Sequence, residues 1–138
     1  SIQYMITSGC TASTQYAYAE MLRLSCEGVI NFVEDTKAYA ERARRMKKIF
    51  CDNGFTITYP RDVTEEIGDG FFFSLSYPGM TGGELVSELI SYGVSSINLD
   101  TTGSLEHGVR ACTSRMRDEL YPVLEERMKM FRQDHPLP

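Results

Sequence analysis

Arg110 is the residue whose surroundings in the sequence best suit ligand chemistry. It lies in a short segment, 109–114, whose alternating residue types predict a strand. A strand fixes the direction of a side chain, and the planar guanidinium can meet a carboxylate through two parallel hydrogen bonds. A polar loop at 100–108 precedes this segment. Spacing alone leaves two roles open for Arg110, a ligand contact or an ordinary strand salt bridge.

The other residues capable of catalysis have weaker settings. His107 and Ser104 lie in the polar loop before Arg110, so both are only weak candidate contacts, whereas His135 lies in the tail. Neither histidine is flanked by a residue that would complete a nucleophilic pair. The acidic pairs Glu65-Glu66 and Glu125-Glu126 fall in a polar loop and on a helix, where solvated carboxylates are expected. We therefore assign no catalytic residue.

A basic run occupies one predicted helix and comprises Arg42, Arg44, Arg45, Lys47 and Lys48. It could bind a phosphate or an acidic partner. It also lies on the polar side of the helix near its C-terminal end, where the helix dipole favours cations, and we favour this structural role. The formal charge of −5, from 19 acidic and 14 basic residues, excludes a domain-wide basic surface for nucleic acid.

The sequence contains no common cofactor or metal motif. Cys10, Cys26, Cys51 and Cys112 form no C-x-x-C pair and are not spaced with histidines as zinc ligands, so we expect reduced thiols and no metal site. No P-loop or G-x-G-x-x-G is present. No apolar run approaches the ~18 residues of a membrane span, and no signal peptide is evident. These features predict a cytoplasmic protein without a membrane partner.

The 138 residues, of which 42% are hydrophobic, suit one domain covering 1–138. Hydrophobic spacing predicts a helix from Thr11 to Cys26, a break at Gly28 and a second helix from Val29 to about Asn53-Gly54. The remaining predicted elements are strands at 55–59 and 71–77, a helix after the capping box Thr81/Glu84, strands at 94–99 and 109–114, and a last helix with Met116, Leu120, Leu124, Met128 and Phe131 on one stripe.

This order, α-α-β-β-α-β-β-α, predicts an α+β fold with two layers. We expect a small, mainly antiparallel sheet of about four strands, packed against helices on one side. The unit at 71–99 would be a parallel crossover if both of its strands share one sheet. Segment 62–70 is predicted as a polar loop, Pro122 lies in the first turn of the last helix, and the tail at 135–138 is predicted to fray.

Several short motifs, in their order, resemble the C-terminal small domain of class I/II, fold type I, pyridoxal-phosphate aminotransferases. The motifs are Gly54-Phe55, Gly70-Phe71-Phe72-Phe73, Tyr92-Gly93-Val94 and Gly108-Val109-Arg110-Ala111-Cys112, followed by a closing helix. The segment at 11–17 also resembles the family's entry into its small domain. The resemblance covers about residues 11–132.

The resemblance implies that Arg110 binds the α-carboxylate of an amino-acid or 2-oxo-acid substrate. It also implies a full-length homodimeric enzyme that transfers an amino group, with pyridoxal phosphate held by a large domain of the same polypeptide. The loop at 100–104 departs from the family's usual proline-glycine and phenylalanine-glycine pattern, which leaves substrate preference open.

The family's Schiff-base lysine has no counterpart in this chain. That lysine follows a Ser or Thr by three residues, whereas Glu34, Arg44, Arg45 and Glu126 stand three residues before Lys37, Lys47, Lys48 and Lys129. We therefore expect a fragment that binds no cofactor and is inactive by itself. The related lyases and acyltransferases share this domain and stay open as alternatives. So does a stand-alone α/β module that binds a small anion through the same arginine.

Overall fold

The computed structural model describes residues 5–6, 9–67 and 70–137. Contacts between Cα atoms divide the chain into two units, Ser1–Lys37 and Ala38–Pro138. The expectation of one aminotransferase-like domain stays a prediction. No helix in the described ranges is both long and apolar enough to cross a bilayer.

Helix α2, Ala12–Cys26, confirms the first predicted helix. Thr11 is its extended N-cap, and Gly28 adopts a positive φ of 75° beyond its C-terminal end. Arg23 holds the last turns together through ion pairs with Glu20 and Glu27. No residue of α2 is buried, and Leu24 and Ser25 are half-buried.

Helix α3, Phe32–Asp52, begins three residues later than predicted. The side-chain oxygen of Asn31 accepts hydrogen bonds from the backbone N–H groups of Val33 and Glu34, both at 3.1 Å, and this cap fixes the start. Val33 therefore lies exposed at the beginning of the helix, and the buried stripe consists of Ala43, Met46 and Phe50. Gly54, with φ 91°, ends the helix as the Asn-Gly pair predicts.

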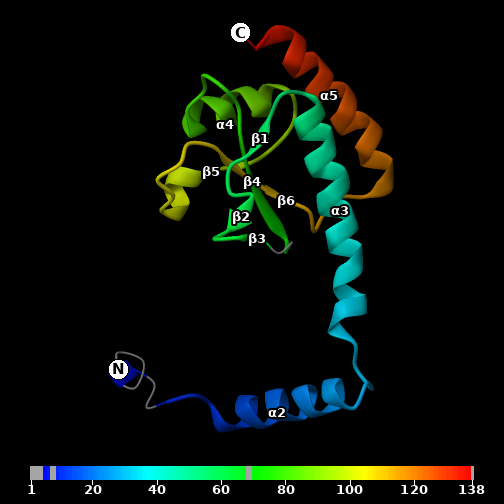
Figure 1. Cartoon of the computed structure of the whole chain (residues 1–138). Coiled ribbons are helices and arrows are strands. Elements are labelled where there is room, and N and C mark those ends of the chain that lie inside the picture. Colours follow the sequence, from blue (N-terminus) through cyan, green and yellow to red (C-terminus); the bar gives the residue numbers. More distant parts are fainter. Residues whose placement is uncertain (1–4, 7–8, 68–69, 138) are drawn as a thin grey trace. The chain divides into compact units, whose positions relative to one another are not determined.

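A four-stranded antiparallel sheet forms the second layer, in the order β1-β4-β6-β5 (Figure 1). Its strands are β1 Thr56–Ile57, β4 Phe72–Ser76, β5 Ile97–Asn98 and β6 Val109–Cys112. Because β4 and β5 both pair antiparallel with β6, they run parallel to each other with β6 between them. The predicted sheet and its parallel crossover are confirmed, but β5 is only two residues long.

The segment predicted as a polar loop contains a small hairpin. Strands β2 (Arg61–Asp62) and β3 (Glu65–Glu66) pair antiparallel, with Val63 at a positive φ of 49° in the turn. All four strand residues are exposed. Without a buried face the hairpin has no apolar alternation, so the hydrophobic pattern could not predict it.

The two remaining α-helices begin in different ways, α4 at a capping box and α5 with a proline in its first turn. The Thr81 hydroxyl accepts from the Glu84 N–H, and the Glu84 carboxylate accepts from the Thr81 N–H, which confirms the capping box of α4, Gly82–Ser91. The last helix, α5, spans Tyr121–Asp134, after a short 3₁₀ turn η2 at Asp118–Leu120. Met116 therefore lies before the helix, because Pro122 sets the helix start in its first turn.

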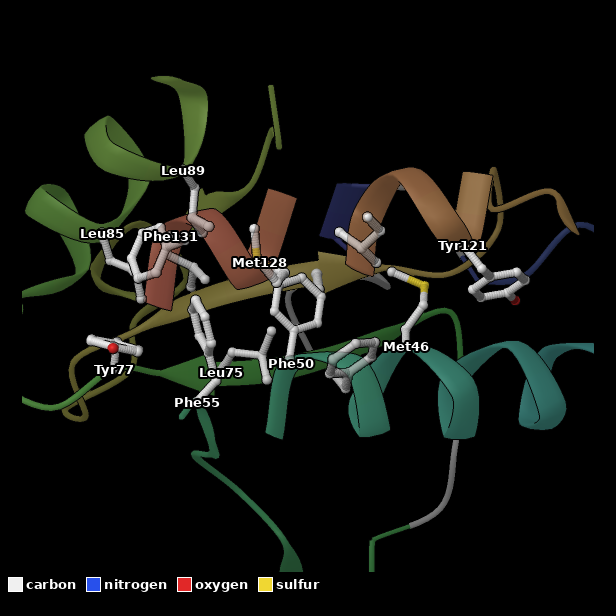
Figure 2. Packing of buried hydrophobic residues seen from close by; sticks show 14 residues of the cluster. Met46, Phe50, Phe55, Leu75, Tyr77, Leu85, Leu89, Tyr121, Met128 and Phe131 are labelled. Atoms are coloured by element: carbon white, nitrogen blue, oxygen red, sulfur yellow. The ribbon is translucent and has the colours of Figure 1, made fainter. Parts of the chain in front are cut away.

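All three helices of the Ala38–Pro138 unit bury side chains against one face of the sheet (Figure 2). Phe50 of α3, Leu85 of α4 and Phe131 of α5 are at most 2% exposed and share one cluster with Leu75 and Val109 of the sheet. This confirms the α+β fold with helices on one side. The tail prediction was wrong for residues 135–137, because Leu137 packs against this cluster and Tyr77 Oη donates to the His135 carbonyl at 2.5 Å; Pro138 lies outside the described residues.

Candidate functional site: an arginine on the outer face of the sheet

Arg110 lies in the middle of β6, with its side chain on the face of the sheet away from the core. Val109 and Ala111 on either side of it are buried in the core, so strand alternation places Arg110 on the opposite face. Its register partners are Ser74 on β4 and Ile97 on β5. The arginine is thus held between two neighbouring strands.

Gly108 allows β6 to approach β4 closely just before Arg110. Its φ is 151°, and a Cβ at this position would lie 2.3 Å from the Leu75 carbonyl oxygen. Its own carbonyl accepts from the Leu99 N–H at 3.0 Å. Only glycine fits this approach without displacing the strand, so Gly108 fixes the position from which Arg110 projects.

Phe72 supports the Arg110 guanidinium. The Cζ atom of Arg110 lies 4.3 Å from the centroid of the Phe72 ring, a cation–π distance. The register pairs Ser74 with Arg110 and Phe72 with Cys112, which makes Phe72 and Arg110 diagonal neighbours on one face. Within residues 5–6, 9–67 and 70–137, Arg110 has no carboxylate partner, so the salt-bridged alternative is not what the structure describes.

Arg110 lines a cavity of about 280 Å³. β1 pairs with β4 at Leu75 and Ser76, and Phe73, which lies beyond this pairing on β4, lines the cavity. Its apolar wall is formed by Ile57, Ile67, Phe72, Phe73 and Leu99. Its polar side chains are Lys47, Tyr59, Ser74, Thr102 and Arg110. Among the residues that the structure describes, the lining contains two cations and no carboxylate.

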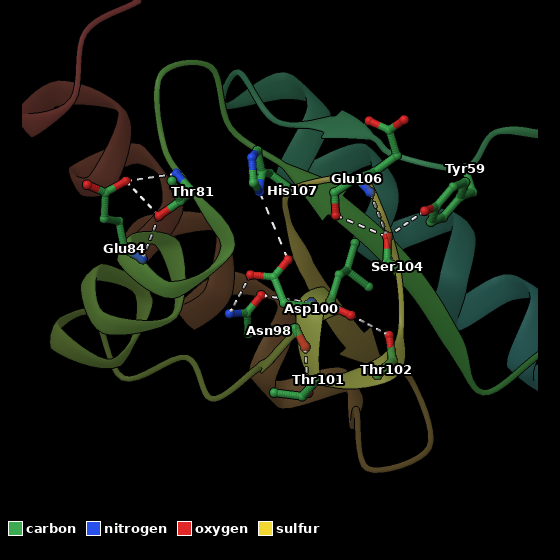
Figure 3. A network of polar contacts seen from close by, with 11 residues as sticks. Tyr59, Thr81, Glu84, Asn98, Asp100, Thr101, Thr102, Ser104, Glu106 and His107 are labelled. Atoms are coloured by element: carbon green, nitrogen blue, oxygen red, sulfur yellow. Dashed lines mark hydrogen bonds and ion pairs between the residues drawn. The ribbon is translucent and has the colours of Figure 1, made fainter.

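The loop before Arg110 is folded by its own polar side chains (Figure 3). Within it, η1 covers Leu99–Thr102, and the Asn98 side chain accepts from the Asp100 N–H at 3.1 Å. Ser104 Oγ accepts from the Glu106 N–H at 3.0 Å and lies 2.5 Å from Tyr59 Oη. These bonds give Ser104 a structural role. Of residues 98–108, Leu99 and Thr102 line the cavity and Ser104 does not.

The two histidines lie away from the cavity lining. His107 is exposed, with Nδ1 4.0 Å from an Asp100 carboxylate oxygen. His135 packs against the Phe131 ring at 4.6 Å, and its Nε2 lies 3.3 Å from Glu88 Oε2. The structure therefore gives His135 a packing role at the end of α5.

The predicted acidic pairs are exposed, as expected. Glu65 and Glu66 form strand β3, and Glu125 pairs with Lys129 at 2.7 Å. No group of three or more His, Cys, Asp or Glu residues in the described ranges could hold a metal ion. Cys26, Cys51 and Cys112 carry free, exposed thiols. Partial burial raises the pKa of the Cys51 thiol above its ordinary value, with a further contribution from Asp52.

The four lysines have different surroundings. Lys37, Lys48 and Lys129 are exposed and paired with acidic residues at 2.5–2.7 Å. Lys47 lines the Arg110 cavity, beside the Phe73 ring at 5.7 Å. Among the described lining residues, none is an acid that could face a pyridine nitrogen, so this described set does not fit pyridoxal phosphate, and we derive no step of its chemistry from this chain.

The cavity partners of Arg110 were not predicted from the sequence. The contact of Phe72 with Arg110 depends on the register of β4 against β6, two strands separated by more than thirty residues. No protein-family model matches the chain, and no curated protein is significantly similar to it. Function therefore has to be argued from the cavity itself.

Proposed function

We propose that the Arg110 cavity binds the carboxylate of a small organic acid whose body is apolar. The observation that carries the proposal is half-buried Arg110, stacked on Phe72, in a cavity whose described lining residues include no carboxylate. Two parallel hydrogen bonds to a carboxylate match the guanidinium fork. The apolar walls would cover the rest of the ligand, so an aliphatic or aromatic side chain fits better than a charged one.

The amino-acid and 2-oxo-acid substrates of aminotransferases belong to this ligand class. With the motif resemblance around Arg110, this favours the small domain of a pyridoxal-phosphate aminotransferase as the biological setting. In that setting a large domain of the same polypeptide would hold the cofactor, the enzyme would be a cytoplasmic homodimer, and Arg110 would orient the substrate by its α-carboxylate. Orientation of this kind lowers the barrier by holding reacting groups in place.

A second candidate is a module that binds a small organic acid without any further domain. The observation that favours it is that the described residues of this cavity already combine a guanidinium with an apolar wall. Both functions predict carboxylate binding at Arg110. They differ in amino transfer, which only a cofactor-loaded polypeptide that includes this chain would perform.

Calorimetric titration of the chain with 4-methyl-2-oxopentanoate tests the carboxylate site. We expect binding that Arg110→Ala weakens about tenfold or more, while Arg110→Lys retains part of the affinity because charge remains but the fork is lost. The amide of the same acid should not bind. Arg44→Ala is the matched control, since Arg44 is exposed and paired with Glu41 away from the cavity. Equal binding by wild type and Arg110→Ala would contradict the proposal.

Amino transfer separates the two candidate functions. Spectroscopic assay of the cofactor-loaded polypeptide that includes this chain should show turnover of an apolar amino acid, with a large loss in Arg110→Ala. Turnover that is insensitive to this substitution would contradict the aminotransferase setting. Carboxylate binding at Arg110 without any turnover would favour the binding module.

A further inference from the structure

Three arginine side chains surround a second cavity, of about 430 Å³, on the Ala38–Pro138 unit. Arg42 comes from α3, whereas Arg115 and Arg117 lie in the turn between β6 and η2. Ser114, Met116 and Leu120 are the other described residues of the lining, and none of these six carries a carboxylate. The basic run of α3 thus gains two further cations from a segment more than seventy residues away.

The turn that carries two of these arginines is anchored from inside. Thr113 is fully buried, and its N–H and hydroxyl donate to the Phe71 carbonyl at 2.8 and 3.3 Å. Met116 packs against the hydrophobic core, and its N–H donates to the Thr113 carbonyl at 3.1 Å. Because Met116 turns inward between them, Arg115 and Arg117 are both held toward solvent at the cavity.

The charge of these arginines is only weakly compensated. Arg42 makes a long hydrogen bond of 3.5 Å to the Ser114 carbonyl, and Arg115 has no ion pair in the described ranges. Arg117 lies 3.3 Å from Glu119, but both side chains are more than 60% exposed, and exposed pairs of this kind are weak. An incoming anion can therefore displace Glu119 at little cost.

We propose that this cavity binds a phosphate group, as free phosphate or as a phosphate ester. A carboxylate has two oxygens and is satisfied by one guanidinium, whereas a phosphate brings a charge of about −1.5 to −2 and at least three acceptor oxygens. Arginines that come from two segments and surround one cavity therefore suit the several oxygens of a phosphate better than the two of a carboxylate. Arg45 is not part of the site, because it pairs with Asp118 at 2.8 Å and stacks on Tyr121 at 3.6 Å.

Nuclear magnetic resonance titration of the labelled chain with inorganic phosphate, at constant ionic strength, tests the site. We expect amide shift changes at residues 113–117, and a dissociation constant at least about tenfold weaker in Arg115→Ala and Arg42→Ala. Arg44→Ala is the control, because it removes the same charge from the same helix outside the cavity. Circular dichroism checks that each variant is folded. Arg115→Ala is the variant least able to disturb the fold, because Arg115 is exposed.

The proposal is overturned if phosphate does not bind, if Arg44→Ala weakens it as much as Arg115→Ala, or if acetate binds equally well. A parallel titration with phenyl phosphate distinguishes the two sources of the ligand. Tighter binding of phenyl phosphate supports a phosphate ester, and equal binding supports free phosphate. Neither the titration with phosphate nor that with phenyl phosphate depends on Arg110. A negative result in these titrations therefore leaves the carboxylate proposal unaffected.

Discussion

Gly108 lies where β6 passes closest to β4, and Gly108→Ala tests whether this approach holds Arg110 in position. An added Cβ would lie 2.3 Å from the Leu75 carbonyl and 3.1 Å from the Thr58 hydroxyl, where ordinary contacts begin at 3.4 Å. Relief requires β6 to move away from β4, which weakens ladder hydrogen bonds worth about 0.5–1.5 kcal/mol each. A side chain at positive φ adds about 1–2 kcal/mol. We expect a total loss of about 3 kcal/mol.

Gly103→Ala is the matched control for this substitution. Gly103 also has a positive φ, of 81°, but an added Cβ would meet no atom within 4 Å. Its cost should be the conformational part alone, about 1 kcal/mol. The difference between the two variants therefore isolates the close approach of the strands.

Urea unfolding, followed by near-ultraviolet circular dichroism of the buried tyrosines, measures both losses. At a slope of about 2 kcal/mol per molar urea, Gly108→Ala should lower the unfolding midpoint by about 1.5 M and Gly103→Ala by about 0.5 M. Weaker carboxylate binding should accompany only the first. If Gly108→Ala lowers the free energy of unfolding by no more than Gly103→Ala, the close approach of β6 to β4 does not require glycine at position 108.

Three further substitutions test the fold around the site. Leu75→Ala, at a fully buried position of β4, should cost about 2–5 kcal/mol in urea unfolding, and a loss below 1 kcal/mol would contradict the core described here. The backbone N–H and the hydroxyl of Thr81 both hold the pKa of Glu84 below its ordinary value. Thr81→Ala should cost about 1 kcal/mol in urea unfolding, because the hydroxyl no longer caps α4, and should raise the pKa of Glu84 only part of the way, because the backbone bond stays; an unchanged stability would contradict the side-chain cap. The hydrogen bond to Asp134 raises the pKa of Tyr92 to about 12, above the ~10 of an unfolded tyrosine, so this bond stabilises the fold below pH ~10 and is lost toward pH 12. Unfolding of Tyr92→Phe should therefore approach that of wild type as pH rises through this window, and a constant difference would refute the linkage.

The sequence predicted those elements whose ends carry a specific chemical signal. Asn53-Gly54, the Thr81/Glu84 box and Pro122 set helix ends correctly because each acts through its own backbone or a residue three positions away. The β2–β3 hairpin carries no such signal, since both strands are exposed. The start of α3 was misplaced because the cap at Asn31 overrides the apolar pattern that begins at Val29.

In the candidate site too, the sequence predicted the local features but not the contacts between distant segments. Strand alternation puts Arg110 on the face opposite Val109 and Ala111, and the structure shows that these two residues are buried in the core. Its contact with Phe72, and the gathering of Arg42 with Arg115, depend on pairing between segments far apart in the chain. Such pairings follow from the three-dimensional register, which a single sequence does not specify.

The most direct test of the central claim is a crystal structure of the chain with 4-methyl-2-oxopentanoate bound. We predict both carboxylate oxygens about 2.7–2.9 Å from the terminal nitrogens of Arg110, with the aliphatic end against the apolar wall that includes Phe72 and Leu99. A ligand bound elsewhere, or an Arg110 side chain turned away from the carboxylate, would contradict the account.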